Sequence, residues 1–400
     1  MNVTTKPARM LAAGIASLLL MNCSKSSDDS NPSFPVLTIS TITAVEGTGT
    51  NAVFNFELTL SAASNQAVSV TVSTEDGTAK AGQDYVAFSG RTVSFQPGET
   101  KKTVPVEIIS EEWKENTEEF RVQITNPVNC TVPSATGRGF ITNDDNQIFF
   151  EDIGYTTPTT YPGYNLVWAD EFNGNALDLA SWNFETGDGC PNVCGWGNNE
   201  LEWYTAGDNL YMQRGKMIIE ARPENIGGKN YTSTRITTQR KKSFQYGRID
   251  IRAKVPYGQG IWPALWMLGD NITTVNWPAC GEMDIMELIG QEPNKVHSTV
   301  HFPTGAGPRN ISKSVTKTEN FSDAFHVYSL IWEQDRMRFL VDDQLISEVV
   351  KNDISPNNYP FNAPFFFIFN VAVGGNWPGS PNATTPFPQW MFVDYVRVFQ

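Results

Sequence analysis

Histidine, cysteine and basic side chains are scarce in this sequence. Its 400 residues include 3 His, 5 Cys, and 29 Lys and Arg against 43 Asp and Glu, for a formal net charge of −14. That acidic balance argues against a nucleic-acid partner, because phosphate binding needs a positively charged surface. The few His and Cys residues offer no second ligand pair for a zinc site. Any catalysis is therefore expected to depend on carboxylates.

Long hydrophobic runs are also missing. The longest apolar run, over 10–21, is shorter than the roughly 20 residues that a membrane-spanning helix needs, and it follows Lys6 and Arg9. A short apolar run behind a basic head is typical of a signal peptide. We expect no membrane-spanning helix in the rest of the chain.

Cys23 directly follows this run, and the stretch 24–31 behind it is polar and acidic. The pattern resembles a bacterial lipoprotein signal, which implies removal of residues 1–22, lipidation of Cys23 and a polar tether over 23–35. Acidic residues just behind the cysteine are similar to a signal for display on the cell surface. The expected location is therefore the outer membrane, facing outward, with ordinary secretion as the alternative.

Glycine, proline and aromatic residues, in contrast, are plentiful. The chain has 31 Gly, 24 Pro, 24 Phe and 11 Trp, and charged residues make up only 18%. This composition favours an all-β protein over a helical or disordered one, and the length predicts two or three domains. Ten of the eleven Trp residues lie between Trp168 and Trp390, so the two halves of the chain differ chemically.

Residues 36–146 alternate polar and apolar side chains in seven short runs, which predicts a β-sandwich. Acidic and glycine-rich turns separate the runs. These turns are Glu46-Gly47, Asp76-Gly77-Thr78-Ala79, Gly82-Gln83-Asp84-Tyr85, Gln96-Pro97-Gly98-Glu99, Glu118-Glu119-Phe120 and Asn143-Asp144-Asp145. Together they resemble a Calx-beta domain, an Ig-like sandwich, over nearly the whole segment.

The Calx-beta resemblance implies a calcium site in acidic loops at one end of the sandwich, because oxygen ligands suit this cation. The candidate ligands are Glu46, Asp76, Asp84, Glu112 and Asp145. The alternative is that these are solvated turn residues on a spacer domain. Residues 147–162 have little periodicity and are predicted to be a linker.

Residues 163–400 alternate through many strands and predict a second, larger all-β domain with two sheets. Its most informative segment is Glu282-Met283-Asp284-Ile285-Met286-Glu287. On a regular strand Glu282 and Asp284 share a face, and Glu287 joins them only if a β-bulge adds one residue near Ile285. The sequence therefore predicts three carboxylates on one face of a bulged strand.

Three adjacent carboxylates repel one another, so their presence indicates a function that needs them. Retaining glycoside hydrolysis uses a carboxylate nucleophile and a nearby carboxylic acid, and requires no cofactor. A calcium site is the alternative for the same three side chains.

The acidic segment and several other motifs resemble glycoside hydrolase family 16, in particular its laminarinase-type β-1,3-glucanases. The motifs include Trp168-Ala169-Asp170-Glu171-Phe172, Trp196-Gly197-Asn198-Asn199-Glu200-Leu201, Gly260-Ile261-Trp262-Pro263-Ala264, His297-Ser298-Thr299-Val300-His301 and Gly374-Gly375-Asn376-Trp377-Pro378. The resemblance covers 163–400 and implies a β-jelly-roll of the concanavalin A-like type. It implies Glu282 as nucleophile, Glu287 as acid/base, and Asp284 as the hydrogen-bonding partner of Glu282.

Aromatic side chains stack on the apolar faces of sugars, while polar neighbours bind the hydroxyl groups. Trp262, Trp277 and Trp377 lie in family motifs and are the predicted stacking residues, although Trp side chains often pack in cores instead. Asn198 and Arg235 are predicted on the glycone side and His301 on the leaving-group side. Trp266 fits either the core or the groove.

The family resemblance also implies a structural calcium at Glu171 and Asp394, joining the two ends of the domain. Cys190 and Cys194 are close enough to form a disulfide, whereas Cys130 and Cys280 are expected to be buried thiols.

The predicted protein is a monomeric endo-hydrolase of β-1,3-glucan, bound to the membrane only through its lipid. The alternatives are a mixed-linkage glucanase or galactanase of the same fold, and a non-catalytic glycan-binding protein.

Overall fold

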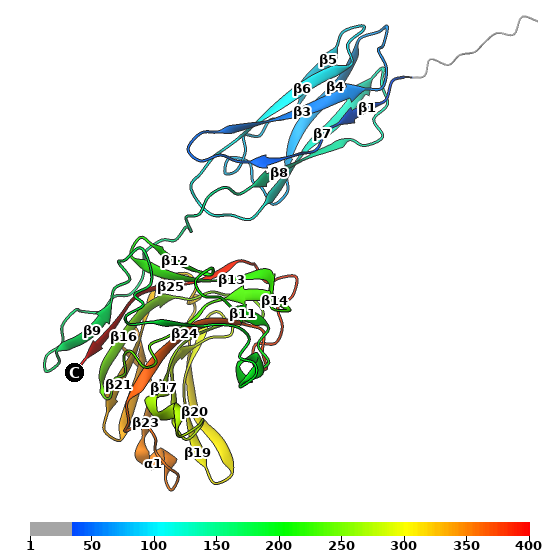
Figure 1. Ribbon diagram of the computed structural model, residues 1–400. Helices are drawn as coiled ribbons and strands as arrows, with labels where there is room; N and C mark the ends of the chain where they lie inside the picture. Colours follow the sequence, from blue (N-terminus) through cyan, green and yellow to red (C-terminus); the bar gives the residue numbers. More distant parts are fainter. Residues whose placement is uncertain (1–33) are drawn as a thin grey trace, which may run out of the picture. The chain divides into compact units, whose positions relative to one another are not determined.

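A computed structural model describes residues 34–400, which form two compact units divided between Asn146 and Gln147 (Figure 1). The predicted signal peptide, Cys23 and most of the predicted tether lie outside the described residues. Within the described part of the chain, no helix has the length and apolar character needed to cross a bilayer.

The first unit is a sandwich of a three-stranded sheet, ordered β1-β3-β6, and a five-stranded sheet, ordered β2-β8-β7-β4-β5. Its alternating strands bury one face each; in β3, for example, Phe54, Phe56 and Leu58 point into the core. The strands are β1 Leu37–Ile39, β2 Ile42–Val45, β3 Ala52–Leu60, β4 Val68–Asp76, β5 Arg91–Phe95, β6 Lys101–Ile108, β7 Glu118–Val128 and β8 Thr136–Thr142. The predicted sandwich is confirmed, with β2 as an additional short strand.

The second unit contains a seven-stranded sheet, ordered β10-β15-β24-β17-β18-β19-β20, and a ten-stranded sheet. The larger sheet follows the order β11-β14-β13-β25-β16-β21-β22-β23, with β12 paired to β13 and β9 paired to β25. This arrangement confirms the predicted all-β class.

The strands that build the seven-stranded sheet are β10 Asn183–Glu185, β15 Arg235–Thr237, β17 Ile261–Gly269, β18 Glu282–Glu287, β19 Lys295–Thr304, β20 Gly307–Thr316 and β24 Phe365–Val373. The ten-stranded sheet consists of β9 Leu166–Asp170, β11 Glu202–Tyr204, β12 Leu210–Gln213, β13 Lys216–Ile226, β14 Lys229–Ser233, β16 Gly247–Lys254, β21 His326–Glu333, β22 Arg336–Val341, β23 Gln344–Val350 and β25 Gln389–Phe399. Three short helical turns connect strands: η1 Cys194–Gly197, η2 Asp270–Thr273 and α1 Lys351–Ile354.

The seven-stranded sheet has a core face and a cleft face, which its central strands show by alternation. In β24, Phe367 and Phe369 join the main core, whereas Phe366 and Ile368 face a cleft on the opposite side. The paired strand β17 follows the same pattern, because Trp262, Ala264, Trp266 and Leu268 line the cleft. Both faces of these strands are covered, so they are apolar along most of their length.

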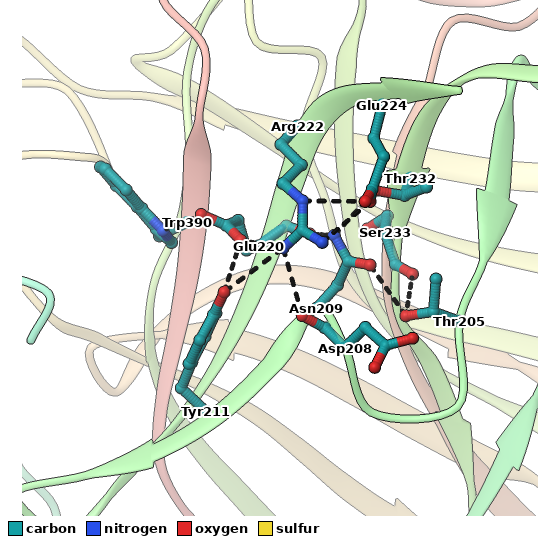
Figure 2. A network of polar contacts seen from close by, with 10 residues as sticks. All are labelled: Thr205, Asp208, Asn209, Tyr211, Glu220, Arg222, Glu224, Thr232, Ser233 and Trp390. Atoms are coloured by element: carbon teal, nitrogen blue, oxygen red, sulfur yellow. Dashed lines mark hydrogen bonds and ion pairs between the residues drawn. The ribbon is translucent and has the colours of Figure 1, made fainter. Parts of the chain in front are cut away.

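A polar network fixes the edge of the larger sheet formed by β12, β13 and β14 (Figure 2). Arg222 Nη1 donates to the buried Glu220 Oε2 over 2.7 Å. Thr205 donates to Asn209, whose amide donates to Thr232 Oγ1 over 3.0 Å. Because Thr205 directly follows β11, this network holds the end of β11 against β14.

The segment 147–162 differs from the linker predicted for it. Ile148 and Phe150 are buried in a cluster with Phe325 and Phe392, and the backbone N–H of Thr157 donates to the Tyr395 hydroxyl over 3.0 Å. The segment is therefore part of the second unit. Its apolar residues are too widely spaced to show a strand or helix period, which is why the sequence suggested a linker.

Replacing Phe150 with alanine should destabilise the second unit, because the side chain is 3% exposed and leaves a cavity between Phe325 and Phe392. The expected loss is about 3–5 kcal/mol of unfolding free energy. Calorimetry of the full chain measures it as a lower midpoint for the second unit. The matched control is Ile153→Ala, since that side chain is 54% exposed. Equal midpoints for the two variants would show that the segment behaves as a linker.

Candidate active site

The three acidic residues of β18 share the cleft face because the strand contains a bulge. Asp284 pairs with Trp266 on β17 and Met286 pairs with Leu265, so Ile285 is the extra residue. Met283, Ile285 and Met286 point into the main core, and Glu282, Asp284 and Glu287 line the cleft. The predicted bulge is confirmed at the predicted place.

The cleft has a volume of about 850 Å³ and lies over β17, β18, β19 and β24. All the residues predicted to bind a sugar line it together with the three acids: Asn198, Arg235, Trp262, Trp277, His301 and Trp377. These residues come from segments up to 179 positions apart in the sequence, and the fold gathers them at one site.

Two indole N–H groups and one imidazole hold the carboxyls of β18. Trp277 donates to Glu282 Oε2 over 2.8 Å, and Trp262 donates to Glu287 Oε1 over 3.1 Å. His301 Nε2 lies 3.3 Å from Asp284 Oδ2 and 3.7 Å from Glu282 Oε1. Each glutamate therefore has one oriented oxygen.

Burial raises the pKa of all three carboxyls. Burial and the nearby Asp284 raise the pKa of Glu282 to about 8, and burial and the charge of Glu282 raise that of Glu287 to about 7. Burial also raises the pKa of Asp284 well above its ordinary value. Because adjacent acids titrate together, the cluster holds protons at neutral pH, as general acid catalysis requires.

Aromatic side chains form the walls on both sides of the acids. Trp277 and Trp377 are 45% and 39% exposed, so both present indole surface to a ligand. Trp377 packs edge-on against Trp262, with ring centres 5.5 Å apart, and against His297 at 5.0 Å. Such exposed rings suit the apolar faces of sugar units.

Arg235 occupies the far end of the cleft, in a setting that fixes its guanidinium. Glu185 accepts a hydrogen bond from its Nε. The guanidinium lies over the rings of Trp196 and Trp266, at 4.4 and 4.9 Å from their centres. Trp266 therefore belongs to the cleft. The sequence alone did not decide between the cleft and the core.

The cleft also contains Trp196, Glu200, His297 and Asn370, which sequence reasoning did not select. Asn370 had a visible signal, because it is the one polar residue in the apolar strand β24. Glu200 lies in a quoted family motif, but its burial depends on strands distant in the sequence.

The calcium predicted at Glu171 and Asp394 does not fit the structure. Glu171 forms a two-pronged ion pair with Arg397, and Asp394 pairs with Lys216 at 2.8 Å and Arg252 at 2.6 Å. Basic side chains thus already neutralise both carboxylates, and the two are not brought together in any described cluster of possible ligands. We correct that prediction accordingly.

Cysteines are arranged as predicted among the described residues. Cys190 and Cys194 form a disulfide beside η1, which carries Trp196 to the cleft. Cys130 and Cys280 are buried free thiols, and burial raises the pKa of Cys280 to about 11.

Acidic residues gather at one end of the first unit in three overlapping groups that have the spacing of cation ligands. These groups are Glu46, Glu111 and Glu115; Glu46, Asp144 and Asp145; and Asp84, Glu115 and Glu118. Glu111 Oε1, Glu118 Oε2 and Asp145 Oδ2 are buried without a hydrogen-bond partner. Burial raises the pKa of Glu46 to about 7 and that of Glu118 to about 8. Such carboxyls fit a hard cation.

Two of the five predicted ligands of the first unit lie outside these groups. Asp76 accepts hydrogen bonds from the Tyr85 hydroxyl and the Ala81 N–H, and Glu112 is exposed. Glu46, Asp84 and Asp145 do belong to them. The direction of side chains in the loop around Glu112 does not follow from strand alternation, so the sequence could not select between neighbouring acids.

Comparisons with known proteins agree with this geometry. Residues 197–396 match glycosyl hydrolases family 16, and residues 29–145 match the Calx-beta domain. The chain is 42% identical over 275 residues to the glucan endo-1,3-beta-glucosidase A1 of Niallia circulans, which covers 62% of this chain and 40% of that protein. It is 39% identical over 257 residues to a beta-glucanase of Rhodothermus marinus, which covers 60% of this chain and 86% of the relative.

A solved structure extends the likeness to the fold. The laminarinase catalytic domain of Thermotoga maritima MSB8 is 44% identical to this chain and superposes with a TM-score of 0.57. The match covers 59% of this chain and 98% of that domain. This chain thus spans less than half of the Niallia protein but nearly all of the isolated Thermotoga domain.

Chelation of divalent cations should leave the thermal midpoint of the second unit unchanged, because Lys216 and Arg252 already neutralise Asp394. Calorimetry with and without EDTA checks this. Lys216→Met should instead lower the midpoint, at a cost of about 1.5–3 kcal/mol for the lost hydrogen bonds between charged groups, while Arg252 still pairs with Asp394. A drop with EDTA in the wild type would restore the calcium assignment.

Proposed function

Because the chain belongs to glycosyl hydrolase family 16, we propose that its second unit is an endo-acting β-1,3-glucanase that cleaves laminarin-type glucans with retention of configuration. The observation that carries the proposal is the face of β18, where three partly protonated carboxyls meet between exposed tryptophans. The proposed linkage comes from the names of two similar proteins, the glucan endo-1,3-beta-glucosidase A1 of Niallia circulans and the laminarinase of Thermotoga maritima, and the cleft supplies the chemistry.

Glu282 is the proposed nucleophile. Trp277 orients its carboxyl through a hydrogen bond, His301 Nε2 lies 3.7 Å from it, and Asp284 contacts it as a hydrogen-bonding partner. Asp284 is the most buried of the three, and the hydrogen bond between the two carboxyls lets them share one proton, so Glu282 is free to react as a carboxylate when that proton lies on Asp284. An oriented carboxylate of this kind attacks the anomeric carbon and forms a glycosyl ester.

Glu287 is the proposed acid/base. Its Oε1 accepts from Trp262, which leaves Oε2 for the glycosidic oxygen. In the first step Glu287 gives its proton to that oxygen as the sugar–oxygen bond breaks. Formation of the ester then removes the charge of Glu282, so the pKa of Glu287 falls. The Glu287 carboxylate can now take a proton from the water that cleaves the ester and restores Glu282.

Azide rescue tests these roles separately. Glu282→Gly and Glu287→Gly should each reduce the turnover of laminarin by several orders of magnitude. On an aryl β-glucoside oligomer, azide should restore activity to both, giving an α-glycosyl azide with Glu282→Gly and a β-glycosyl azide with Glu287→Gly. Glu319→Gln, at an exposed position, is the matched control. The same azide anomer from both variants would refute the assignment.

Product analysis on laminarin, lichenan, agarose and carrageenan separates the alternatives. The proposal predicts internal cleavage of laminarin as the preferred reaction. Preference for lichenan or a galactan would retain the mechanism but change the substrate, and binding without cleavage would leave a glycan-binding protein.

We also propose that the acidic end of the first unit binds calcium, which accords with the orphaned carboxyl oxygens of Glu111, Glu118 and Asp145. The ligands must be ionised to bind the cation, and their raised pKa values put that ionisation near neutral pH. Lipidation of Cys23 and display on the cell surface remain proposals from the sequence.

Calcium affinity of the full chain should increase as the pH rises from about 6 to 8, since protons on Glu46 and Glu118 compete with the cation. Titration calorimetry with Ca²⁺ measures it, with Mg²⁺ as a second cation. Glu46→Gln should lose most of the affinity, whereas Glu112→Gln, outside the cluster, should keep it. Equal loss in both variants, or binding that is independent of pH, would contradict the site.

A further inference from the structure

A second pair of acids lies beside the cleft, away from β18. Glu200 lines the cleft, and Glu202 lies fully buried behind it as the first residue of β11. The Oε2 of Glu202 accepts the N–H of Val373 over 2.7 Å. Its Oε1 is buried without a hydrogen-bond partner among the oriented donors, and the Glu202 carboxyl is in hydrogen-bonding contact with that of Glu200.

The directions of the neighbouring hydrogen bonds can be worked out from Trp266, whose indole N–H can only donate. Trp266 donates to Asn370 Oδ1 over 2.8 Å. The Asn370 amide nitrogen must therefore donate to the Tyr204 hydroxyl, at 3.1 Å. Because that hydroxyl oxygen is now accepting, its proton is directed at Glu200 Oε2, at 3.2 Å.

The other oxygen of Glu200 also accepts a hydrogen bond, from the Asn198 amide at 3.2 Å. Both oxygens of Glu200 are thus acceptors, as in an ionised carboxylate, and the charge of Arg235 favours that form. Two buried carboxyls in contact cannot both be ionised without a large cost. The proton that they share therefore resides on Glu202 and points at Glu200.

We propose that Glu202 is a positioning residue for substrate: its buried carboxylic proton holds the Glu200 carboxylate and the Asn198 amide in place to bind the hydroxyl groups of a glucosyl unit at the Arg235 end of the cleft. This inference rests on the proposed glucanase function. It gives Glu202 a part in sugar recognition although the Glu202 side chain does not itself touch the sugar. The surroundings are rigid enough for the task, since β11 pairs with β14 and is held at Thr205 by the network of Figure 2.

Two substitutions of Glu202 distinguish the effect of its hydrogen bonds and its proton from the effect of its packing. In Glu202→Gln the amide still donates to Glu200 and its carbonyl still accepts from Val373, but the group no longer titrates. In Glu202→Leu the volume remains and both hydrogen bonds are lost. On laminarin near pH 6, Glu202→Gln should keep KM within about twofold, and Glu202→Leu should raise KM by about tenfold with kcat nearly unchanged.

The pH profile distinguishes positioning from a structural role. In the wild type burial and the charge of Glu200 raise the pKa of Glu202 well above its ordinary value, so the proton stays on Glu202 until the pH has risen well past the usual range of a carboxyl. KM should accordingly rise in the alkaline range in the wild type and stay flat in Glu202→Gln. The same alkaline rise in both proteins, or a loss of kcat with constant KM in Glu202→Leu, would overturn the proposal.

Infrared spectroscopy gives a readout that does not depend on activity. Near neutral pH the wild-type spectrum should contain one protonated-carboxyl band that is lost in Glu202→Gln, while the bands of the other protonated acids, such as those of β18, remain unchanged. If the wild type does not cleave laminarin, the glucanase function fails while this band still tests the proton. If cleavage occurs and the band is unaffected by Glu202→Gln, the positioning role fails alone.

Discussion

The three carboxyls of β18 repel one another, and the surrounding structure of the second unit has to accommodate this repulsion. A bulge at Ile285 brings Glu287 onto the face of Glu282 and Asp284, while the residues between them stay in the core. Two indole N–H groups then orient the glutamate oxygens without supplying a charge. An arginine at this place would hold the acids ionised, whereas burial leaves them able to exchange protons.

Three carboxylates at a distance from the cleft of the second unit have a different setting. Glu171, Asp394 and Asp152 form ion pairs with arginine or lysine, so each of these carboxylates faces an opposite charge. In the first unit the acidic loops have neither arrangement, since Glu46 and Glu118 meet other acids. The three settings correspond to two uses of one functional group, exchanging protons and holding strands together, and to the cation binding proposed for the first unit.

Local pattern made the β18 site predictable. Alternation with a period of two places Glu282 and Asp284 on one face of the strand. On a regular strand Glu287 would lie on the opposite face, so its membership in the acidic motif indicates the bulge. The chain of hydrogen bonds from Trp266 to Glu202 was not predictable, because it joins Tyr204 to Asn370 across 166 residues. The ion pairs of Glu171 and Asp394, where the sequence suggested calcium, were not predictable for the same reason. The resemblance identified two carboxylates, but the basic residues that neutralise them come from β13, β16 and the remote end of β25.

The segment ahead of β9 has a practical consequence for dissecting this protein. Asp152 pairs with both Lys216 and Arg252, and Phe150 fills a pocket against Phe325 and Phe392. A fragment that begins at residue 163 would expose that apolar pocket to water and leave two cations of the larger sheet short of a counter-charge. The second folding unit therefore starts near Gln147. A protease site meant to separate the two units should be placed before that residue.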